Sequence, residues 1–524
     1  GWTGRYENMN NIRVSTNGGL VTENWFDLNA SRYTPSSTLQ RMELLKTGYM
    51  GTLSLGWDNY LFLELTGRQE RSSTLKDQSF FYPSANLSFL FTQAFHMPSW
   101  WNYGKLRLSY GIVGNAPETY TANIVYEQGS DNGFTWNTIP SSWGNADIRP
   151  EKKYEYEIGL ESKFLNNRLG IDVSYYNNRV KDQILSTPQP STSGVKNVLM
   201  NVGEVANHGW DISISATPIL TRDFRWDLTA NYGVYKNKVV KLADGVPYLE
   251  ILNSGGSGIK IQAVEGQPMG DIYAQVPQVN ENGEYLVSDK GLYLNQTELQ
   301  KVGNINPAGV GGLFNSFSYK NVFLDFSIDF RIGGDVINEM NQYATAVGLT
   351  PESLKYRDTE HGGLSYYYPG DNNSSGIPVQ VDPSTGAGPN GEIIYHDGII
   401  LPGVVASTGE RNTRIIPAGY YYNTTYNWGT EAEQLTYRHS VFDNSYVKLR
   451  ELTIGYQFPE KMISKLGLGR LSVSVFGRNL FYFYKALKNY DAESSVGTSW
   501  ANQATVGSST TATRSFGVSL RASF

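Results

Sequence analysis

The sequence predicts an all-β protein whose strands are long enough to cross a membrane as an antiparallel β-barrel. Three observations support this: apolar and polar residues alternate over long segments, short turns alternate with long loops, and the last segment also alternates. In residues 513–524 one set of alternate positions is apolar: Phe516, Val518, Leu520, Ala522 and Phe524. Alternate residues of a strand face opposite sides, so one side would meet lipid and the other a wet lumen. Taken alone, this segment also fits an edge strand of a soluble sandwich.

Alternating segments recur along the chain, and we expect about fourteen strands in all. Most are roughly ten residues or longer, as tilted membrane strands are, whereas strands in globular proteins most often have about five or six residues. The clearest expected strands cover residues 53–57, 60–66, 106–112, 151–164, 168–184, 210–216, 224–240, 322–332 and 471–476. Helical periodicity is nearly absent, and only residues 459–466 indicate a short helical turn.

The connections between these strands come in two sizes. Short turns are expected at residues 58–59, 165–167, 221–223 and 319–321. Long loops are expected at residues 115–150, 186–207, 241–307, 338–443 and 487–513. Short turns on one side of a membrane and long loops on the other are typical of outer-membrane barrels. Loops of this length would count against a compact soluble domain.

The composition is compatible with this fold class and excludes some others. The 524 residues include 36 tyrosines, and the formal net charge is −6, so no basic surface for nucleic acid is expected. No apolar run reaches eighteen residues, which excludes a membrane-spanning helix. The mean hydropathy of −0.38 is polar, as alternation allows in a barrel. The many aromatic residues fit barrel girdles and sugar-binding proteins equally well.

Residues that carry enzyme chemistry are not arranged in any recognisable motif. There is no cysteine, and the five histidines have no zinc-ligand spacing. We find no nucleophile elbow and no phosphate-binding loop, so we expect no enzyme activity, no cofactor and no catalytic metal. Residues 382–391 are faintly like a calcium loop but lack its ligand spacing and closing glutamate.

The candidate binding residues are aromatic side chains in the long loops, because aromatic faces stack on sugar rings and on peptide side chains. The predicted substrate-binding residues are Trp136, Trp143, Tyr366, Tyr367, Tyr368, Tyr421 and Trp428. The alternative is that these rings pack the loops together or form an interfacial girdle. Charged residues on the polar faces of the strands would line a pore or pair inside the wall: Asp172, Asp211, Asp325, Asp329, Arg331 and Arg521.

Five stretches in order along the chain add up to a recognisable pattern. They cover residues 105–115, 201–209, 302–307 (with Tyr319 and Lys320), 443–459 and 475–480. Each stretch is weak alone, but together they resemble SusC/RagA-type TonB-linked outer-membrane transporters. The resemblance implies a barrel of twenty-two strands with an N-terminal plug, in the outer membrane of a Gram-negative bacterium. It also implies a SusD-like surface lipoprotein as a lid, and import of oligosaccharides or peptides with energy delivered through TonB.

The sequence differs from the family pattern in one large respect. We recognise no plug, no TonB-contacting box and only about fourteen strands, so we expect residues 1–524 to be the C-terminal part of such a barrel. Since Gly1 is not an initiator Met, we expect a processed product or a fragment. A second chain or segment would then complete the wall through strands before Leu20, because open sheet edges in lipid leave backbone groups unpaired.

Two kinds of function remain open from the sequence. The first is TonB-dependent import of a nutrient oligomer, with a glycan favoured over a peptide, through the missing plug and the lid. The second is a structural role, in which a SusC-like wall serves as a scaffold in an outer-membrane complex. Disabling the TonB energy source distinguishes them, because only the first predicts a loss of uptake.

Overall fold

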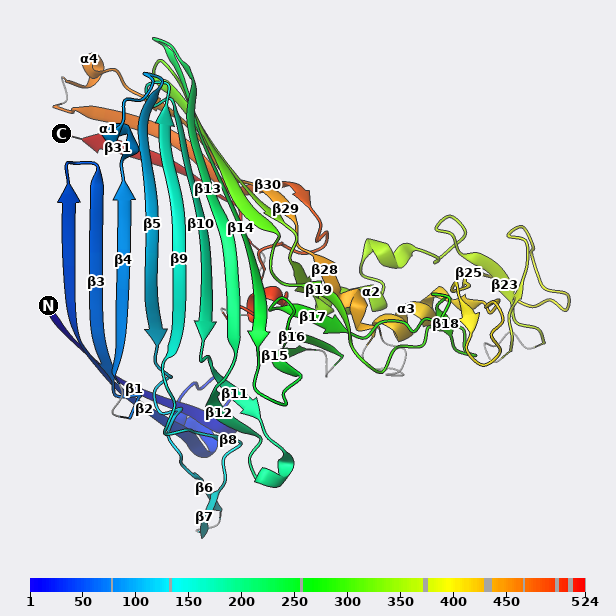
Figure 1. Ribbon diagram of the computed structural model, residues 1–524. Helices are drawn as coiled ribbons and strands as arrows, with labels where there is room; N and C mark the ends of the chain where they lie inside the picture. Colours follow the sequence, from blue (N-terminus) through cyan, green and yellow to red (C-terminus); the bar gives the residue numbers. More distant parts are fainter. Residues whose placement is uncertain are drawn as a thin grey trace. The chain divides into compact units, whose positions relative to one another are not determined.

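Long antiparallel strands dominate the computed structural model (Figure 1). It describes residues 1–76, 79–131, 134–254, 258–370, 376–427, 436–464, 467–494, 499–507 and 512–523. The chain divides into two compact units. Unit 1 contains Gly1–Trp210 and Asn237–Pro247, and unit 2 contains Asp211–Lys236 and Tyr248–Phe524.

Fourteen strands form the main sheet, which confirms the predicted fold class and strand number. The first eight in sheet order are β1 (Trp2–Leu20), β2 (Ser31–Trp57), β3 (Leu61–Ser72), β4 (Ser79–Phe89), β5 (Trp101–Asn115), β9 (Glu151–Phe164), β10 (Leu169–Lys181) and β13 (Glu204–Leu220). The next six are β14 (Phe224–Lys241), β20 (Gly309–Tyr319), β21 (Val322–Ile332), β29 (Tyr446–Gln457), β30 (Arg470–Lys485) and β31 (Ser515–Ser523). The strands lie in the sheet in the same order as in the chain, which is an up-and-down antiparallel topology.

The short turns lie where the sequence predicts them. Asp58 and Asn59, between β2 and β3, have φ of 48° and 61°. Leu165, Asn166 and Asn167, between β9 and β10, have φ of 56°, 56° and 63°. Asn and Asp adopt this left-handed conformation at lower cost than most residues, so they favour tight hairpin turns.

The beginning of the sheet differs from the prediction. Strands β1 and β2 cover residues 2–20 and 31–57, whereas the sequence pattern indicated no strand before residue 53. In β1 the apolar residues Met9, Ile12 and Val14 are sparse and do not alternate regularly, so the period-two signal is weak there.

Unit 1 carries short strands within segments that were predicted to be loops. They are β6 (Glu127–Asp131), β7 (Phe134–Thr138), β8 (Ser142–Trp143), β11 (Ile184–Pro188) and β12 (Asn197–Asn201). Strands β11, β12 and β8 form one small sheet, and β6 pairs with β7. A small core of Leu75, Phe80, Ala122 and Ile148 lies in this unit. The helical elements of unit 1 are short: η1 (Leu28–Ala30), α1 (Phe91–Ala94) and η2 (Ser191–Ser193).

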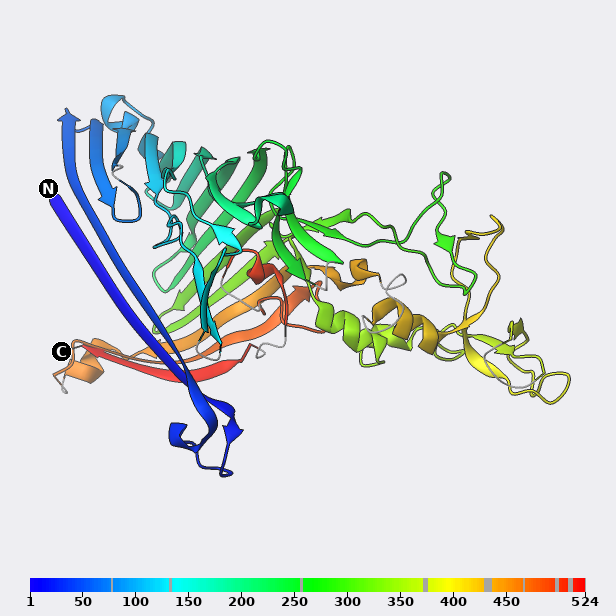
Figure 2. The ribbon, with the colours of Figure 1, turned by 90° about the horizontal axis from the view of Figure 1, so that it is seen from below.

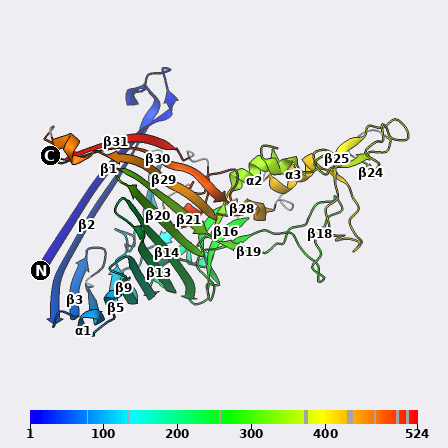
Figure 3. The same ribbon diagram turned by 90° about the horizontal axis from the view of Figure 1, so that it is seen from above.

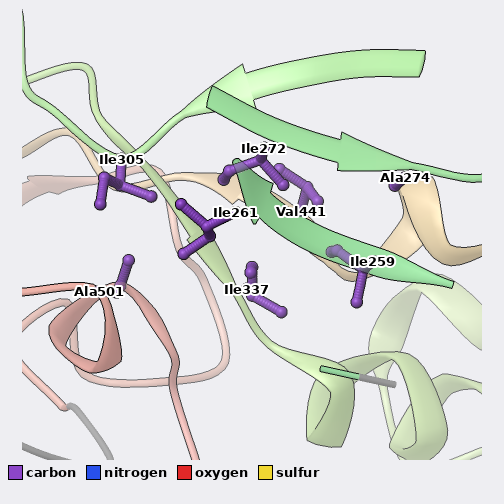
Figure 4. Close-up of a cluster of buried hydrophobic side chains, with 9 residues drawn as sticks. Ile259, Ile261, Ile272, Ala274, Ile305, Ile337, Val441 and Ala501 are labelled. Atoms are coloured by element: carbon purple, nitrogen blue, oxygen red, sulfur yellow. The ribbon is translucent and has the colours of Figure 1, made fainter. Parts of the chain in front are cut away.

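Unit 2 also contains small sheets inside the predicted long loops. One has four strands: β15 (Tyr248–Ser254), β16 (Ile259–Val264), β17 (Asp271–Ala274) and β19 (Gln300–Asn304). Strand β22 (Asp335–Ile337) pairs with β28 (Val441–Asp443). These strands contribute to a buried cluster, most of which is labelled in Figure 4. Its members are Ile259, Ile261, Ile272, Ala274, Ile305, Ile337, Val441, Ala501 and Ala504.

Two helices in the segment between β22 and β28 were not predicted. They are α2 (Glu339–Ala346) and α3 (Ala418–Tyr426), which pack against each other (Figure 3). The same segment holds β23 (Leu364–Tyr367), β24 (Val379–Gln380), β25 (Tyr395–Ile399) and β27 (Ile416–Pro417) in one sheet, and β26 (Val404–Val405) beside β18 (Leu286–Val287). Unit 2 also contains the short helical elements η4 (Pro351–Leu354), η5 (Tyr437–Ser440), α4 (Glu460–Ile463) and η7 (Asn502–Ala504). Helix α4 confirms the one helical turn that was predicted.

None of the helices in the described part of the chain has both the length and the apolar character of a membrane-spanning helix.

The main sheet in unit 2 has one exposed apolar face. Strands β29, β30 and β31 run side by side in Figure 2, and their register aligns Ile454, Val475 and Val518. The apolar side chains on this face of β31 are largely exposed: Phe516 by 74%, Val518 by 71% and Leu520 by 70%. Directly opposed residues in neighbouring strands point to the same side, so these residues form a continuous apolar surface.

On the opposite face of the sheet, strands β14, β20, β21 and β29 carry a polar row that is internally paired. The register aligns Asp227, Ser316, Asp325 and Thr453 in the neighbouring row. The Ser316 hydroxyl donates to Asp325 at 2.6 Å. The Asp227 carboxylate lies 2.5 Å from Nε of Arg225. The alternation predicted from the sequence therefore gives one apolar and one polar face in unit 2.

Candidate functional site

A cavity in unit 2 brings together residues that are far apart in the sequence. Its volume is about 550 Å³, within the usual range of ligand pockets. We name it the Arg331 cavity. Its polar lining includes Tyr235 of β14, Arg331 of β21, Tyr446 of β29, and Asn306, Asn444 and Glu493 from loops. Ile305 and Ala504 belong both to this lining and to the buried hydrophobic cluster of Figure 4, so part of the cavity wall is packed against the hydrophobic core of unit 2.

Arg331 is held in place by backbone carbonyl groups. Its Nε donates to the Gly333 carbonyl at 3.1 Å, and its Nη2 donates to the Ile305 carbonyl at 3.0 Å. Gly334 has φ of +79°, and a Cβ there would lie 2.3 Å from Arg331 Nη2. Glycine is therefore needed at this position both for the backbone and for the space that the guanidinium occupies. Among the described residues, no carboxylate forms an ion pair with Arg331.

Glu493 lines the same cavity, but its charge is neutralised. Its carboxylate lies 2.5 Å from Lys448 Nζ and 2.5 Å from Arg450 Nη2. Arg450 also contacts Asp329 at 2.6 Å, which makes a network of two acids and two bases. Burial acts to raise the pKa of Glu493, but the hydrogen bonds and charges of Arg450 and Lys448 outweigh it and hold this pKa at about 2. Glu493 is therefore ionised and fully engaged at neutral pH.

Asn444 presents an acceptor without a partner. Its Nδ2 donates to the Ala492 carbonyl at 2.9 Å, which fixes the orientation of the amide. The residue is only 5% exposed, and its Oδ1 has no hydrogen-bond partner within the described residues. Buried acceptors are normally paired, so an unpaired one at the edge of a cavity indicates a place for a donor.

Three further polar residues of the cavity lining, Tyr235, Asn306 and Tyr446, make contacts within the protein. The Tyr235 hydroxyl donates to Asn306 Oδ1 at 3.0 Å, and Asn306 Nδ2 donates to the Met269 carbonyl at 2.6 Å. The Tyr446 hydroxyl lies 3.5 Å from Glu493 Oε1. In contrast, Arg331 has N–H groups left over, and the Asn444 acceptor has no partner among the described residues.

The sequence predicts Arg331 as one of the charges that line a pore or pair inside the wall, but it does not predict the cavity. Two of the motif stretches could have pointed to the cavity, because residues 302–307 and 443–459 contain its lining residues Asn306, Asn444 and Tyr446. For Asp172 and Asp329 the alternative of pairing inside the wall is confirmed. Asp172 contacts Arg107 at 2.6 Å in unit 1, and Asp329 contacts Arg450 as described above.

The predicted aromatic residues do not form one site. In unit 1, Trp136 on β7 is 50% exposed, and the half-buried Trp143 lies against Tyr126 with ring centroids 5.9 Å apart. Trp428 lies outside the described residues. The four tyrosines lie in the segment of unit 2 between β22 and β28.

Two of these tyrosines are core residues of their segment. Tyr366 and Tyr368 are 1% and 5% exposed and pack with Tyr395 and Ile415, which favours the packing alternative for both rings. Tyr367 is half-buried.

Tyr421 is half-buried on α3, where its ring lies 5.1 Å from that of Tyr422 and 6.1 Å from that of Tyr426. Burial, with Tyr426 beside it, raises the pKa of its hydroxyl above the usual range. Substrate binding by the predicted aromatic residues stays a prediction.

The described residues contain no group of three or more histidine, aspartate or glutamate side chains placed to hold a metal ion. In the stretch that was faintly like a calcium loop, Asp382 Oδ1 accepts hydrogen bonds from the Ser384 N–H at 2.9 Å and hydroxyl at 2.5 Å.

A long antiparallel sheet with an apolar face and an internally paired polar face is typical of the wall of a membrane β-barrel. Residues 2–277 match the family described as TonB dependent receptor-like, beta-barrel, and the chain belongs to this family. This match covers more than half of the 524 residues.

The curated relatives agree with this assignment. The chain is 24% identical over 494 residues to TonB-dependent receptor P3 of Formosa agariphila, which covers 86% of this chain and 42% of the relative. It is 30% identical over 247 residues to TonB-dependent receptor SusC of Bacteroides thetaiotaomicron, which covers 43% of this chain and 24% of the relative. The chain therefore spans less than half the length of these relatives.

A solved structure with the same fold is that of the RagAB peptide transporter. The TM-score is 0.65 at 18% identity, over 94% of this chain and 50% of that chain. At this identity the likeness shows the fold. With the family match and the SusC relative, it confirms the predicted resemblance to SusC/RagA-type transporters.

Proposed function

We propose that this chain forms part of the wall of an outer-membrane transporter that imports a nutrient oligomer with energy from the TonB system. The observation that carries the proposal is the two-faced sheet of unit 2. Its apolar face leaves Phe516, Val518 and Leu520 mostly exposed. Soluble monomers rarely expose large continuous apolar surfaces, whereas lipid covers such a face.

The edges of the sheet support a larger assembly. In the sheet order, β1 has β2 as its neighbour and β31 has β30 as its neighbour. Unpaired backbone groups at a sheet edge cost several kcal/mol each in lipid. We propose that further strands, from a longer chain or a second chain, pair with these edges, and that a plug and a SusD-like lipoprotein lid complete the transporter.

Intact mass spectrometry of the purified complex, with peptide mapping of every band, tests this assembly. A lipoprotein and additional barrel and plug peptides are expected. A complex that contains only residues 1–524 would contradict the assembly.

The cargo is a polar oligomer, and a glycan is favoured over a peptide. The exposed Trp136 and the half-buried Trp143 offer rings of the kind that stack on sugar faces. A peptide is the alternative cargo, and RagAB, which shares the fold, is described as a peptide transporter.

Uptake in the native bacterium tests the transport function. Cells would be given a fluorescent oligosaccharide or a fluorescent oligopeptide, with and without this chain, and with and without a working TonB system. Loss of uptake in both deficient strains, with normal entry of a monosaccharide small enough for porins, is expected. Normal uptake of all oligomers together with a defect in envelope assembly would contradict import and favour the scaffold function.

A further inference from the structure

We propose that the Arg331 cavity is a subsite for a carboxylate group of the imported oligomer. The proposal rests on the import function proposed above and names a chemical class for part of its cargo. Arg331 is the only basic residue on the described lining of the cavity, and a cation at a half-buried site favours an anionic ligand.

The guanidinium is positioned before any ligand arrives. Arginine has five N–H donors, and the two contacts with Gly333 and Ile305 use two of them, so three remain. These contacts fix the plane of the guanidinium, so little side-chain entropy is lost when a carboxylate binds. Guanidinium and carboxylate groups pair through two parallel hydrogen bonds, which gives direction as well as affinity.

The acids near Arg331 are engaged with other donors. Asp335 Oδ2 accepts from the Asn304 backbone N–H at 2.9 Å. Asp443 Oδ1 accepts from the Ser445 N–H at 2.8 Å and from its hydroxyl at 2.6 Å. Both lie close enough to act on Arg331 through space, but neither makes an ion pair with it. Glu493 is paired with Lys448 and Arg450, and neither Asp335 nor Asp443 forms an ion pair with the guanidinium, so its remaining N–H groups stay open to a ligand acid.

The buried Asn444 acceptor is the second, independent observation. It lines the same cavity, and its Oδ1 requires a donor that the described residues do not supply. A ligand that carries a hydroxyl or an N–H near its carboxylate would satisfy both Asn444 and Arg331. Uronic acid sugars and peptide ends both have this arrangement, so the shared chemistry is a carboxylate with a neighbouring donor.

Calorimetric titration of the full-length transporter, purified in detergent, tests the proposal without requiring transport. The probes are trigalacturonate and its methyl ester, and trialanine and trialanine amide. We expect at least one acid to bind ten times or more tightly than its neutral partner. A preference in the first pair indicates a sugar acid, and a preference in the second indicates a peptide. Equal binding, or no binding, within both pairs would overturn the proposal.

Variants connect the preference to the cavity. Arg331→Gln should reduce the acid preference to less than twofold. Arg225→Gln, which removes a cation already paired with Asp227 outside the cavity, should leave the preference unchanged. A folded Arg331→Gln protein with an intact preference would overturn the proposal. If the variant does not fold, the wild-type comparison of acid and neutral probes still decides.

The two proposals can fail separately. Carboxylate preference in the purified protein with TonB-independent uptake would contradict the transport function alone. TonB-dependent uptake without any carboxylate preference would contradict the subsite alone.

Discussion

Replacing Glu493 with glutamine should destabilise the network at the edge of the Arg331 cavity. Lys448 is buried, and Glu493 is its acid partner at 2.5 Å. The variant leaves the ammonium of Lys448 beside the Tyr482 ring, at 4.8 Å, without a counter-charge. Arg450 retains Asp329, so the loss falls mainly on Lys448. Removing one partner of a buried pair costs more than the pair contributes, because a charge remains uncompensated.

The size of the effect follows from the pKa of Glu493. A pKa of about 2 in the folded state, against about 4.3 for a free glutamate, corresponds to about 3 kcal/mol of differential stabilisation. The Glu493 side chain is 32% exposed, so solvent screens part of this interaction. We therefore expect Glu493→Gln to lower the free energy of unfolding by about 2 kcal/mol at pH 7.

The stabilisation that Glu493 provides should decrease as the pH falls. Because the folded state lowers the pKa of Glu493, its contribution is complete above the unfolded pKa and disappears as the pH falls toward 2. Urea unfolding of full-length wild type and variant in lipid vesicles, followed by tryptophan fluorescence, measures the difference. The control is Glu298→Gln, which changes an exposed glutamate of the same unit. A difference that is below about 0.5 kcal/mol at pH 7, or that is constant between pH 6 and 3, would refute the reasoning.

Three further predictions concern other parts of unit 2. The His439 ring stacks on that of Tyr426, with ring centroids 4.3 Å apart. Burial, with Arg438 beside it, lowers the pKa of His439 to about 4. Acidification from pH 7 to 5 should therefore destabilise this region by about 1–2 kcal/mol, because the unfolded state takes up a proton that the folded state does not. Hydrogen exchange in α3 should rise over that range, and unchanged exchange would contradict the assignment. Gly334→Ala should lower the free energy of unfolding by about 1–3 kcal/mol more than Gly266→Ala does. Both glycines have a positive φ, but only Gly334 is crowded by neighbouring atoms. Equal losses of stability in chemical denaturation would exclude this packing effect. Val518→Arg should lower folding stability in vesicles by about 2–4 kcal/mol, and a similar loss for Ser519→Arg would argue against a lipid-facing apolar row.

The main sheet could be predicted because its signal is local. Period-two alternation and Asn- or Asp-containing turns specify each hairpin without long-range information, as at residues 58–59 and 165–167. The helix α2 could not be predicted in this way. Apart from Ala346, it buries the polar residues Asn341, Gln342 and Thr345 while Met340 is exposed, so it lacks the apolar face by which an amphipathic helix is recognised in a sequence.

The small sheets and the cavity depend on contacts between distant residues. Strands β22 and β28 are about one hundred residues apart, and two- or three-residue strands carry little periodicity of their own. The Arg331 cavity joins residues from five separate stretches. Two of its lining residues, Asn306 and Asn444, look like ordinary turn residues in the sequence. Tyr366 and Tyr368 are predicted as binding residues from the sequence but are buried in the structure. Composition alone does not distinguish a buried tyrosine from one on a binding surface.

The central claim is that one face of the main sheet meets lipid and the other meets water. The chain contains no cysteine, so single cysteines at residues 515–520 can each carry a spin label in the native outer membrane. Collision with oxygen, which concentrates in lipid, and with a water-soluble nickel chelate would be measured at each position. The account predicts oxygen contact at positions 516, 518 and 520 and chelate contact at positions 515, 517 and 519. Equal chelate contact at all six positions would contradict it.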